Sequence, residues 1–522
     1  MSRQKPVPVV DIFAGPGGLG EGFSSLHGKT GERSFRIAIS IEKDPIAHRT
    51  LLLRSFFRQF DAGDAPTDYY NFLRASNVKQ DQHWSLLKEK FPKQTQAAES
   101  EAKNAELGKN KPDEVDSWIR GALKGADAWV LIGGPPCQAY SIAGRSRNNG
   151  IPDYVPEEDE RQYLYGEYLR ILATHLPPVF IMENVKGLLS ATLQNGSILE
   201  KILSDLRQPR VAIKNYRGNK SARYRIFSLV KHGESETLNL DDFVVKAEKY
   251  GIPQARHRVI LLGVRDDIDA IQPSVLRPQD PVTVHDILHG LPALRSGLSE
   301  EIDDSTRWRS IVAAAPWRQL FKSIHGINTQ PLQHLAQTSL AKLRRKTLDR
   351  GGEFLHGQQE IRRDTSWYLD RKLDGVCNHT SRSHIAADLH RYFYASIFAK
   401  IMSRSPTLSD FPRKLLPKHS NVQEALDGGH FSDRFRVQLA NRPATTITSH
   451  ISKDGHYYIH YDPAQCRSLT VREAARLQTF PDNYFFCGPR TSQYTQVGNA
   501  VPPLLARQIA EIVQKVLRKA GG

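Results

Sequence analysis

Apolar and polar positions along the chain change their spacing in a regular way, from short continuous apolar runs to runs with helical spacing. The first apolar run, residues 7–13, is followed by a glycine cluster and then by apolar residues three and four positions apart. The same order recurs after residues 35–41, and further apolar runs stand in ADAWVLIGGPPC, PPVFIMENVKGLL and RHRVILLGVR. Short apolar runs predict buried strands, and the helical spacing between them predicts crossover helices. The pattern therefore predicts an α/β fold with a doubly wound parallel sheet that helices cover on both faces.

The alternation of strands and helices is interrupted, and the interruptions divide the chain. Residues 66–126 are polar, so we expect a helical, solvent-exposed insertion there. The alternation stops at residue 266, and residues 266–463 carry basic clusters with Trp, Tyr and His between them. Helical spacing returns in residues 464–522, which end in an amphipathic helix. We expect a first domain over residues 1–265, a second, smaller domain over 266–463, and a C-terminal segment that returns to the first.

Composition narrows the class of protein. The chain has 522 residues, of which 39% are hydrophobic and 25% charged, which is enough for more than one globular domain. No apolar run reaches the ~18 residues of a membrane helix, and the amino terminus makes a poor signal peptide, so we expect a cytoplasmic protein. Four cysteines without a CxxC pair indicate neither a zinc site nor a disulfide framework, and we expect no metal. The formal net charge of +16 favours a polyanionic partner such as nucleic acid.

The glycine cluster DIFAGPGGLGEGF is the first candidate for chemistry. It follows a predicted strand and opens a helix, and glycine lets a backbone approach a ligand closely. No Gly-Lys-Ser/Thr follows, which excludes a P-loop. Glu42 ends the next predicted strand, where a carboxylate can accept hydrogen bonds from ribose hydroxyls. The loop and Glu42 indicate a cofactor with an adenosine moiety; the alternative is a structural turn with a surface glutamate.

A cysteine on a stiff turn is the second candidate. Cys137 follows the apolar run WVLI and the turn GGPP, whose prolines restrict the backbone. Ligands bind open α/β sheets at the carboxyl ends of the strands, so Cys137 is a candidate nucleophile. No histidine stands near it in sequence, but Glu183 follows the run VFIM and can act as a general acid or as a clamp on a substrate ring. The alternatives are a small buried thiol and a carboxylate that caps a helix.

Six motifs, taken together, resemble a known family. DIFAGPGGLGEGF, GGPPCQAYS, MENVKG, QARHRVIL, LTVREAARLQTFPD and QVGNAVPP stand in the same order as in the DNA cytosine-5 methyltransferases, which use S-adenosylmethionine. The motifs cover both ends and the middle of the chain, and six in order are far more specific than any one of them. The resemblance implies a Rossmann-like methyltransferase sheet with a second, smaller target-recognition domain.

The resemblance also implies roles for individual residues. Cys137 would attack carbon 6 of a cytosine, and Glu183 would bind or protonate ring nitrogen 3. Arg258, together with Arg256, would contact the cytosine carbonyl. Glu42 would hold the ribose of S-adenosylmethionine. The other cofactor residues would be Phe13, Ala14, Gly15, Gly17, Gly18, Asp64 (on the adenine amino group), Gly134, Pro135, Leu164, Asn499 and Val501.

The substrate that the resemblance implies is duplex DNA. A cytosine must leave the duplex before a thiol can reach carbon 6, and the phosphate contacts of a basic protein can offset that cost. Residues 266–463 correspond to the family's target-recognition region, in which Thr446 and Ile447 resemble its Thr-Leu element. The resemblance is compatible with a monomer and with a cognate restriction endonuclease in the same system. The motifs do not identify the target sequence or the residues that read it.

Two other functions stay open at this point. One branch of the family methylates tRNA, although the size of residues 266–463 favours a module that reads DNA. The other is a non-catalytic DNA-binding protein of the same fold, although Cys137, Glu183 and Arg258 are all present.

Overall fold

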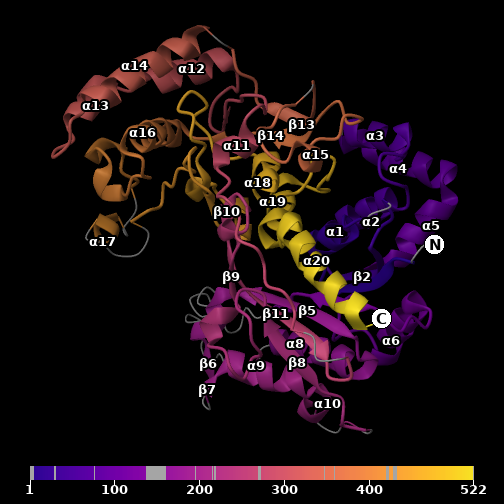
Figure 1. Cartoon of the computed structure of the whole chain (residues 1–522). Helices are drawn as coiled ribbons and strands as arrows, with labels where there is room; N and C mark the ends of the chain where they lie inside the picture. Colours follow the sequence, from indigo (N-terminus) through magenta and orange to yellow (C-terminus); the bar gives the residue numbers. More distant parts are fainter. Residues whose placement is uncertain are drawn as a thin grey trace. The chain divides into compact units, whose positions relative to one another are not determined.

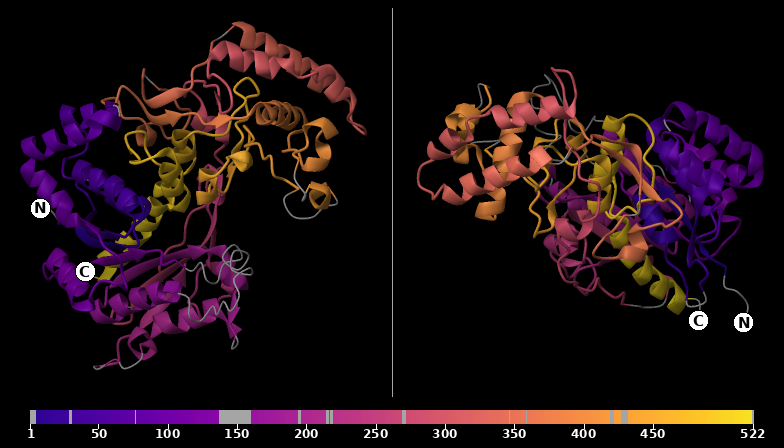
Figure 2. Two further views of the ribbon diagram at one scale, coloured as in Figure 1. Left: turned by 180° about the vertical axis from the view of Figure 1, so that it is seen from behind. Right: turned by 90° about the horizontal axis from the view of Figure 1, so that it is seen from above.

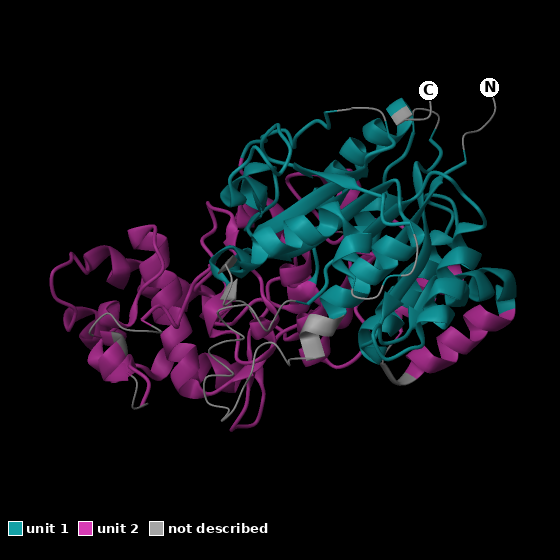
Figure 3. Ribbon diagram, turned by 90° about the horizontal axis from the view of Figure 1, so that it is seen from below, with its two compact units in different colours: residues 1–65, 90–280, 500–522 teal, residues 66–89, 281–499 magenta. Residues whose placement is uncertain are grey.

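The chain folds into two compact units (Figure 3). Unit 1 comprises Met1–Ala65, Lys90–Asp280 and Ala500–Gly522, and unit 2 comprises Pro66–Glu89 and Pro281–Asn499. The structure, a computed structural model, describes residues 5–28, 31–75, 77–136, 160–193, 196–213, 216, 219–268, 272–345, 347–357, 359–418, 422–426 and 432–520.

The centre of unit 1 is an eight-stranded sheet (Figure 1). Its strands are β1 (Val7–Ile12), β2 (Phe35–Glu42), β3 (Ala102–Asn104), β4 (Val130–Gly133), β5 (Val179–Val185), β8 (Tyr224–Ser228), β9 (Val244–Lys246) and β11 (His257–Arg265). Their order is β3-β2-β1-β4-β5-β11-β8, with β9 also paired to β11. The strands from β3 to β5 are parallel, which confirms the predicted α/β sheet.

One predicted strand departs from the parallel pattern. β11 is antiparallel to β5, β8 and β9. The chain reaches it from β8 and β9 through short 3₁₀ turns, and an antiparallel neighbour needs no crossover helix. The short strands β6 (Thr192–Leu193), β7 (Gly196–Ser197) and β10 (Gln254–Ala255) lie outside this sheet.

Helices cover both faces of the sheet. They are α1 (Gly18–Ser24), α2 (Pro45–Arg58), α5 (Pro92–Glu101), α6 (Pro112–Leu123), α8 (Glu160–His175), α9 (Ile198–Arg207), α10 (Pro209–Ala212) and α20 (Pro503–Ala520). Successive residues of β1 point to opposite faces: Val10 packs in one buried cluster with α6, α8 and α9, and Val9 packs in another with α1 and α20. Helix α20 lies beside α1 (Figures 1 and 2). A Cβ built on Gly22 would be 2.4 Å from Cβ of Ala506, so this close approach requires glycine.

Unit 2 is mainly helical. Its helices are α3 (Thr67–Arg74), α4 (Asn77–Lys90, the last residue of which lies in unit 1), α11 (Val284–Leu288), α12 (Ser305–Ala314), α13 (Trp317–Lys322), α14 (Gln330–Arg345), α15 (Thr365–Tyr368), α16 (Ala386–Met402), α17 (Val422–Leu426), α18 (Val471–Leu477) and α19 (Arg490–Asn499). Its strands are β12 (Gly297–Leu298), β13 (Gly351–His356), β14 (Gly375–Thr380), β15 (Ser383–His384) and β16 (Ala444–Thr445). Trp308, Trp317 and Phe393 belong to its apolar core. Among the described residues, we find no helix with the length and apolar character needed to cross a membrane.

These units differ from the division expected from the sequence. Unit 1 extends to Asp280 because the segment after β11 stays packed on it: Leu276 is buried, and its N–H donates to Leu229 O (2.8 Å). Residues 464–499 belong to unit 2, and the segment that belongs to unit 1 starts at Ala500.

The polar insertion also differs from the expectation of exposed helices. Residues 66–89 belong to unit 2, whereas the following part contributes β3 and α6 to unit 1. Val115, Ile119 and Leu123 of α6 are buried against the sheet. Apolar residues at three- and four-residue intervals thus make this part of the insertion core rather than surface.

The motif LTVREAARLQTFPD lies in the buried centre of unit 2. Arg467, just before it, donates from Nη1 and Nη2 to the two carboxylate oxygens of Glu473 (2.6 and 2.7 Å). Arg476 pairs in the same two-pronged way with Asp482, from Nε and Nη2 (2.9 and 2.6 Å). All four side chains are at most 2% exposed. Charges at this depth must be paired, so these ion pairs fix the local fold.

Two histidines beside these ion pairs should make unit 2 sensitive to acid. His379 and His460 are buried, and burial lowers the pKa of each to about 4. The ordinary pKa of histidine is about 6.5, so below that pH these histidines are protonated in the unfolded chain. In the folded chain they bind a proton only near pH 4. The free energy of unfolding should therefore fall as pH drops through this window, by about 3 kcal/mol per histidine at its acid end. Urea unfolding at a series of pH values measures the loss.

A substitution isolates the contribution of one histidine. His379→Gln should reduce the decrease in the free energy of unfolding at low pH. His325→Gln, at an exposed position of the same unit, should leave that decrease unchanged. If the free energy of unfolding fell equally at low pH in the two variants, His379 would not be a source of the acid sensitivity.

Candidate active site

The glycine cluster forms the turn between β1 and α1. Phe13, Gly15 and Gly17 have φ values of 57°, 57° and 95°, and Gly17 is the N-cap of α1. The Gly15 N–H donates to Oε2 of Glu42 (2.8 Å), and the Asp44 N–H donates to Oε1 of the same carboxylate (2.7 Å). Burial raises the pKa of Glu42, against the effect of these hydrogen bonds. The turn and Glu42 thus lie together at the carboxyl ends of two parallel strands.

The last segment of unit 1 lies against this turn. A Cβ built on Gly18 would be 2.3 Å from Val501 O and 3.3 Å from Cβ of Ala500, so a larger residue does not fit. Val501, which was predicted for the cofactor cleft, is therefore beside the turn. Ala14 is held by its N–H, which donates to Ile41 O of β2 (3.1 Å). Asn499, predicted for the same cleft, is the last residue of α19 in unit 2.

An ion pair forms the second part of the site. Arg258 on β11 donates from Nε to Oε1 of Glu183 on β5 (2.9 Å). Arg258 stands opposite Val185 in the antiparallel register, so the Glu183 and Arg258 side chains emerge on the same face of the sheet. The Glu183 and Arg258 side chains are 14% and 16% exposed, so neither is completely shielded from solvent.

The turn GGPP packs against this carboxylate. A Cβ built on Gly134 would lie 2.8 Å from Oε2 of Glu183, and Nδ2 of Asn184 donates to Pro135 O (3.1 Å). These contacts place the residues that lead to Cys137 beside Glu183. Cys137 itself lies outside the described residues.

The structure also gives the positions of three other predicted residues, Asp64, Arg256 and Leu164. Asp64 is exposed in the turn after α2, and its N–H donates to Asp61 O (3.0 Å). Helix α2 starts at the carboxyl end of β2, next to Glu42, and runs back along the sheet. Asp64 comes after the other end of this helix, away from Glu42. The Arg256 side chain is buried, only 2% exposed. Leu164 lies on α8, with Cδ2 3.9 Å from a Cβ built on Gly108.

The sequence pattern missed the residues that do stand next to Glu42. Asn104 ends β3, which pairs with the end of β2, and its Nδ2 donates to the carbonyls of Glu42 (2.9 Å) and Lys43 (3.1 Å). Glu106 follows and pairs with Lys43 (3.5 Å). β3 has three residues and no apolar run, so it gives no periodic signal in the sequence. Only Glu106, the acidic residue that follows β3, could have indicated this part of the site.

Asp11 is a further residue that the motif analysis did not single out. It lies on β1, is 1% exposed, and has Oδ2 within 2.9 Å of a Cβ built on Gly20 of α1. Burial raises the pKa of Asp11 to about 8, although Arg58 lowers it. The carboxyl group is therefore protonated near neutral pH and lies without charge under the glycine turn.

A glycine turn that binds the carboxylate of the next strand, at the carboxyl edge of a doubly wound sheet, defines the class of α/β proteins that bind nucleotide-like cofactors. This chain belongs to the C-5 cytosine-specific DNA methylase family, whose model matches residues 74–214 and 234–515. It is accordingly an enzyme, a DNA cytosine-5-methyltransferase.

Individual relatives match over most of the chain. The chain is 32% identical to the type II methyltransferase M.Bpa9945I of Bacillus paralicheniformis over 98% of this chain and 99% of that protein. It is 26% identical to M.ApeKI of Aeropyrum pernix, a DNA (cytosine-5-)-methyltransferase, over 76% of this chain and 83% of that protein. A crystal structure described as a DNA modification methyltransferase encoded within a prophage (E. coli) has a TM-score of 0.50 at 20% identity, over 98% of this chain and 99% of that one. This last likeness concerns the fold.

Proposed function

We propose that the chain transfers a methyl group from S-adenosylmethionine to carbon 5 of cytosine in a specific sequence of duplex DNA, through a covalent adduct with Cys137. The observation that carries the proposal is the Glu183–Arg258 ion pair (Oε1 to Nε, 2.9 Å) beside Gly134 and Pro135 of the turn that leads to Cys137. A carboxyl group beside a nucleophile suits a ring that must accept charge at a nitrogen while a thiolate adds to a carbon.

The glycine turn fits S-adenosylmethionine, which supplies an activated methyl group when bound. Glu42 is oriented by two backbone N–H groups, and its oxygens retain lone pairs for the hydroxyls of a ribose. A Cβ built on Gly15 would meet no atom within 4 Å, so the backbone there leaves room for a ligand. For the adenine amino group we propose Asn104 and Glu106 at the end of β3, in place of Asp64. The other proposed cofactor residues are Phe13, Ala14, Gly18, Gly134, Pro135, Leu164, Asn499 and Val501.

Side chains of this protein then act on the cytosine ring. The thiolate of Cys137 bonds to carbon 6 of cytosine, and the electron pair of the 5,6 double bond moves towards carbon 5. Glu183 binds or protonates ring nitrogen 3, so that negative charge does not build up on the ring. Arg258 keeps the Glu183 carboxyl group in place and, with Arg256, contacts the cytosine carbonyl. After methylation the carbon 5 proton leaves to a base, and expulsion of the thiolate restores the aromatic ring.

The proposed substrate imposes two further requirements. The cytosine must be flipped out of the duplex at a cost of a few kcal/mol, which the phosphate contacts of a chain with a net charge of +16 can offset. Residues 266–463 include the region proposed to read the target. Because relatives carry type II methyltransferase names, we also propose a cognate restriction endonuclease in the same system. We propose that the enzyme works as a cytoplasmic monomer.

Methyl transfer to defined substrates tests the proposal. The purified chain is incubated with S-adenosylmethionine that carries a tritiated methyl group, and with duplex DNA or tRNA. We expect incorporation into DNA at one short sequence, located by bisulfite sequencing. Incorporation into tRNA alone, or into neither, would overturn the proposed substrate. Duplex DNA with 5-fluorocytosine at the target should trap a covalent complex, because the fluorine cannot leave as a proton does.

The Glu183–Arg258 pair gives a specific prediction. Glu183→Gln keeps the shape of the side chain but cannot give a proton to the ring, so methyl transfer should slow about 10²–10³-fold with little change in S-adenosylmethionine binding. Glu200→Gln, at an exposed position of α9, is the matched control and should leave the rate unchanged. Single-turnover kinetics separate the chemical step from product release. A Glu183→Gln rate equal to that of the control would remove Glu183 from the mechanism.

A further inference from the structure

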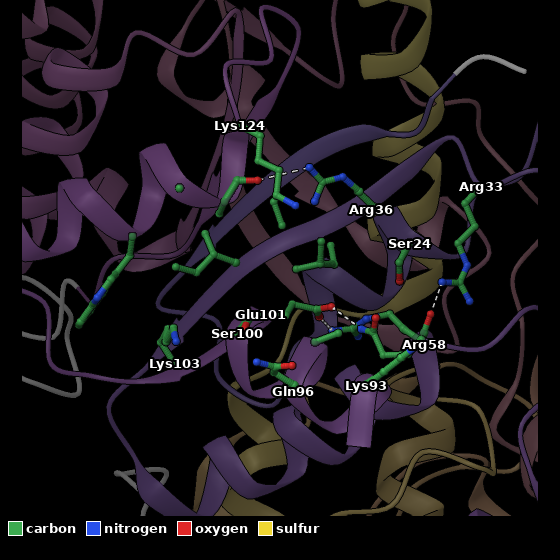
Figure 4. Close-up of a pocket in the computed structure, with 18 residues that line it drawn as sticks. Ser24, Arg33, Arg36, Arg58, Lys93, Gln96, Ser100, Glu101, Lys103 and Lys124 are labelled. Atoms are coloured by element: carbon green, nitrogen blue, oxygen red, sulfur yellow. Dashed lines mark hydrogen bonds and ion pairs between the residues drawn. The ribbon is translucent and has the colours of Figure 1, made fainter. Parts of the chain in front are cut away.

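A cavity lies in unit 1, outside the candidate active site. It has a volume of about 680 Å³ and is lined from α1, α2, β2, α5, β3 and α6 (Figure 4). The residues of β2 that line it are Arg36–Ile39, whereas Glu42 ends the strand. β3 contributes Lys103 to the lining, but neither Glu42 nor a residue of the glycine turn lines the cavity. It is therefore separate from the glycine turn at the carboxyl end of the sheet.

The lining of this cavity is strongly basic, and we call it the cationic cavity. Six cationic side chains and a single carboxylate line it: Arg33, Arg36, Arg58, Lys93, Lys103, Lys124 and Glu101. Glu101 is already paired with Arg58. Lys93, Lys103 and Lys124 have no ion pair with any residue that the structure describes. Clustered like charges repel and cost stability unless a bound anion compensates them.

Two of the three arginines, Arg33 and Arg36, donate to backbone carbonyls, whereas Arg58 pairs with Glu101 and Glu21. Arg33 donates from Nη2 to Phe60 O (2.8 Å), and also to Arg58 O, at the end of α2. Arg36 donates from Nη2 to Ala122 O (3.3 Å) at the end of α6. Carbonyl oxygens orient a guanidinium group without cancelling its charge. In agreement, burial and the neighbouring Arg58 lower the pKa of Arg33. The cavity thus presents preorganised positive charge.

The remaining lining sets the chemical class of the anion. Trp118 is half-buried on α6, and Ile37, Ala38 and Ile39 contribute apolar surface from β2. Gln59, Gln96 and Ser100 add hydrogen-bonding groups. A volume near 680 Å³ is in the range of small-molecule sites. An aromatic ring beside cations suits a nucleotide, because bases stack on aromatic rings and phosphates pair with Lys and Arg.

We propose that the cationic cavity binds a nucleotide through its phosphates, with the base against Trp118. The nucleotide is either free in solution or part of a nucleic-acid strand, since both present the same phosphate and base. The site is distinct from the one proposed for methyl transfer and does not depend on that function.

Lysine footprinting tests the site directly. The purified chain is acetylated with an amine-reactive ester, with and without dCTP, pyrophosphate or a 5′-phosphorylated single-stranded oligonucleotide, and each lysine is read by mass spectrometry. Protection of Lys93, Lys103 and Lys124, but not of Lys220 and Lys515, supports the proposal. Protection by dCTP at lower concentration than by the oligonucleotide identifies a free nucleotide, and the reverse order identifies a strand. Equal acetylation of the three cavity lysines with every probe overturns it.

Variants supply an independent measurement of affinity. Calorimetric binding of dCTP should weaken about tenfold or more in the double variant Lys93→Glu/Lys124→Glu. The control Lys220→Glu/Lys515→Glu makes the same charge change at exposed positions of unit 1 and should bind as the parent does. Trp118→Leu should weaken dCTP binding more than pyrophosphate binding, since only dCTP carries a base. Equal affinities in the two double variants would overturn the proposal, and methyl transfer should be unaffected in both.

Discussion

Cys137→Ser is expected to lower the rate of DNA methylation at least about 10³-fold while S-adenosylmethionine still binds. A serine hydroxyl has nearly the size of a thiol but does not ionise near neutral pH, and the ionised thiolate is the attacking species. The turn before Cys137 is held by Asn184, whose Nδ2 donates to Pro135 O (3.1 Å), so the substitution should not disturb Glu183 or the glycine turn. Tritium incorporation measures the rate, and equilibrium dialysis measures cofactor binding.

Another cysteine of the chain provides the control. Cys377 is completely buried, and burial raises the pKa of its thiol to about 12, so it is not available as a nucleophile. Cys377→Ala should leave the rate per folded molecule unchanged. A Cys137→Ser rate within about tenfold of the parent rate would rule out a covalent adduct as the main route.

Glu473→Gln is expected to lower the free energy of unfolding of unit 2 by about 3–5 kcal/mol. Glu473 accepts Nη1 and Nη2 of Arg467 (2.6 and 2.7 Å) and the N–H of Thr470 (2.7 Å). Burial alone would raise the pKa of Glu473, but the Arg467 charge and its hydrogen bonds keep that pKa well below the usual range. The amide removes the negative charge and leaves Arg467, 1% exposed, as a buried cation without compensation. Urea unfolding monitored by tryptophan fluorescence measures the loss.

The matched control is an exposed ion pair of the same unit. Glu301 pairs with Arg307, and the two side chains are 32% and 54% exposed. Solvent screens such a pair, so Glu301→Gln should change the free energy of unfolding by about 1 kcal/mol or less. If Glu473→Gln cost no more than Glu301→Gln, the buried ion pair would not be a main support of unit 2.

Local patterns predicted the parts of the fold that depend on near neighbours in the chain. The runs that became β1, β2, β4 and β5 are continuous apolar segments, and a buried parallel strand needs such a segment whatever its partners are. The glycine turn was predicted for the same reason, since its positive φ values require glycine at Gly15 and Gly17. Glu183 was predicted because it follows an apolar run.

Prediction failed where the outcome depended on which segments become neighbours. The resemblance suggested Asp64 for the adenine amino group, whereas the pairing of β3 with the end of β2, which no sequence pattern announced, puts Asn104 beside Glu42. The polar composition of residues 66–126 concealed both β3 and the buried face of α6. The same holds for β11, whose direction follows from short connections that carry no periodic signal.

By itself, the sequence determined five strands of the sheet (β1, β2, β4, β5 and β11), the glycine turn, the family and the identity of the chemical groups. Only the tertiary structure decided that Arg258 reaches Glu183, that Val501 closes on Gly18, and that separate basic segments surround one cavity. The physical reason is the range of the interactions. Backbone conformation and apolar spacing act over a few residues, whereas pairing of charges and close packing depend on segments that meet only when the sheet is assembled.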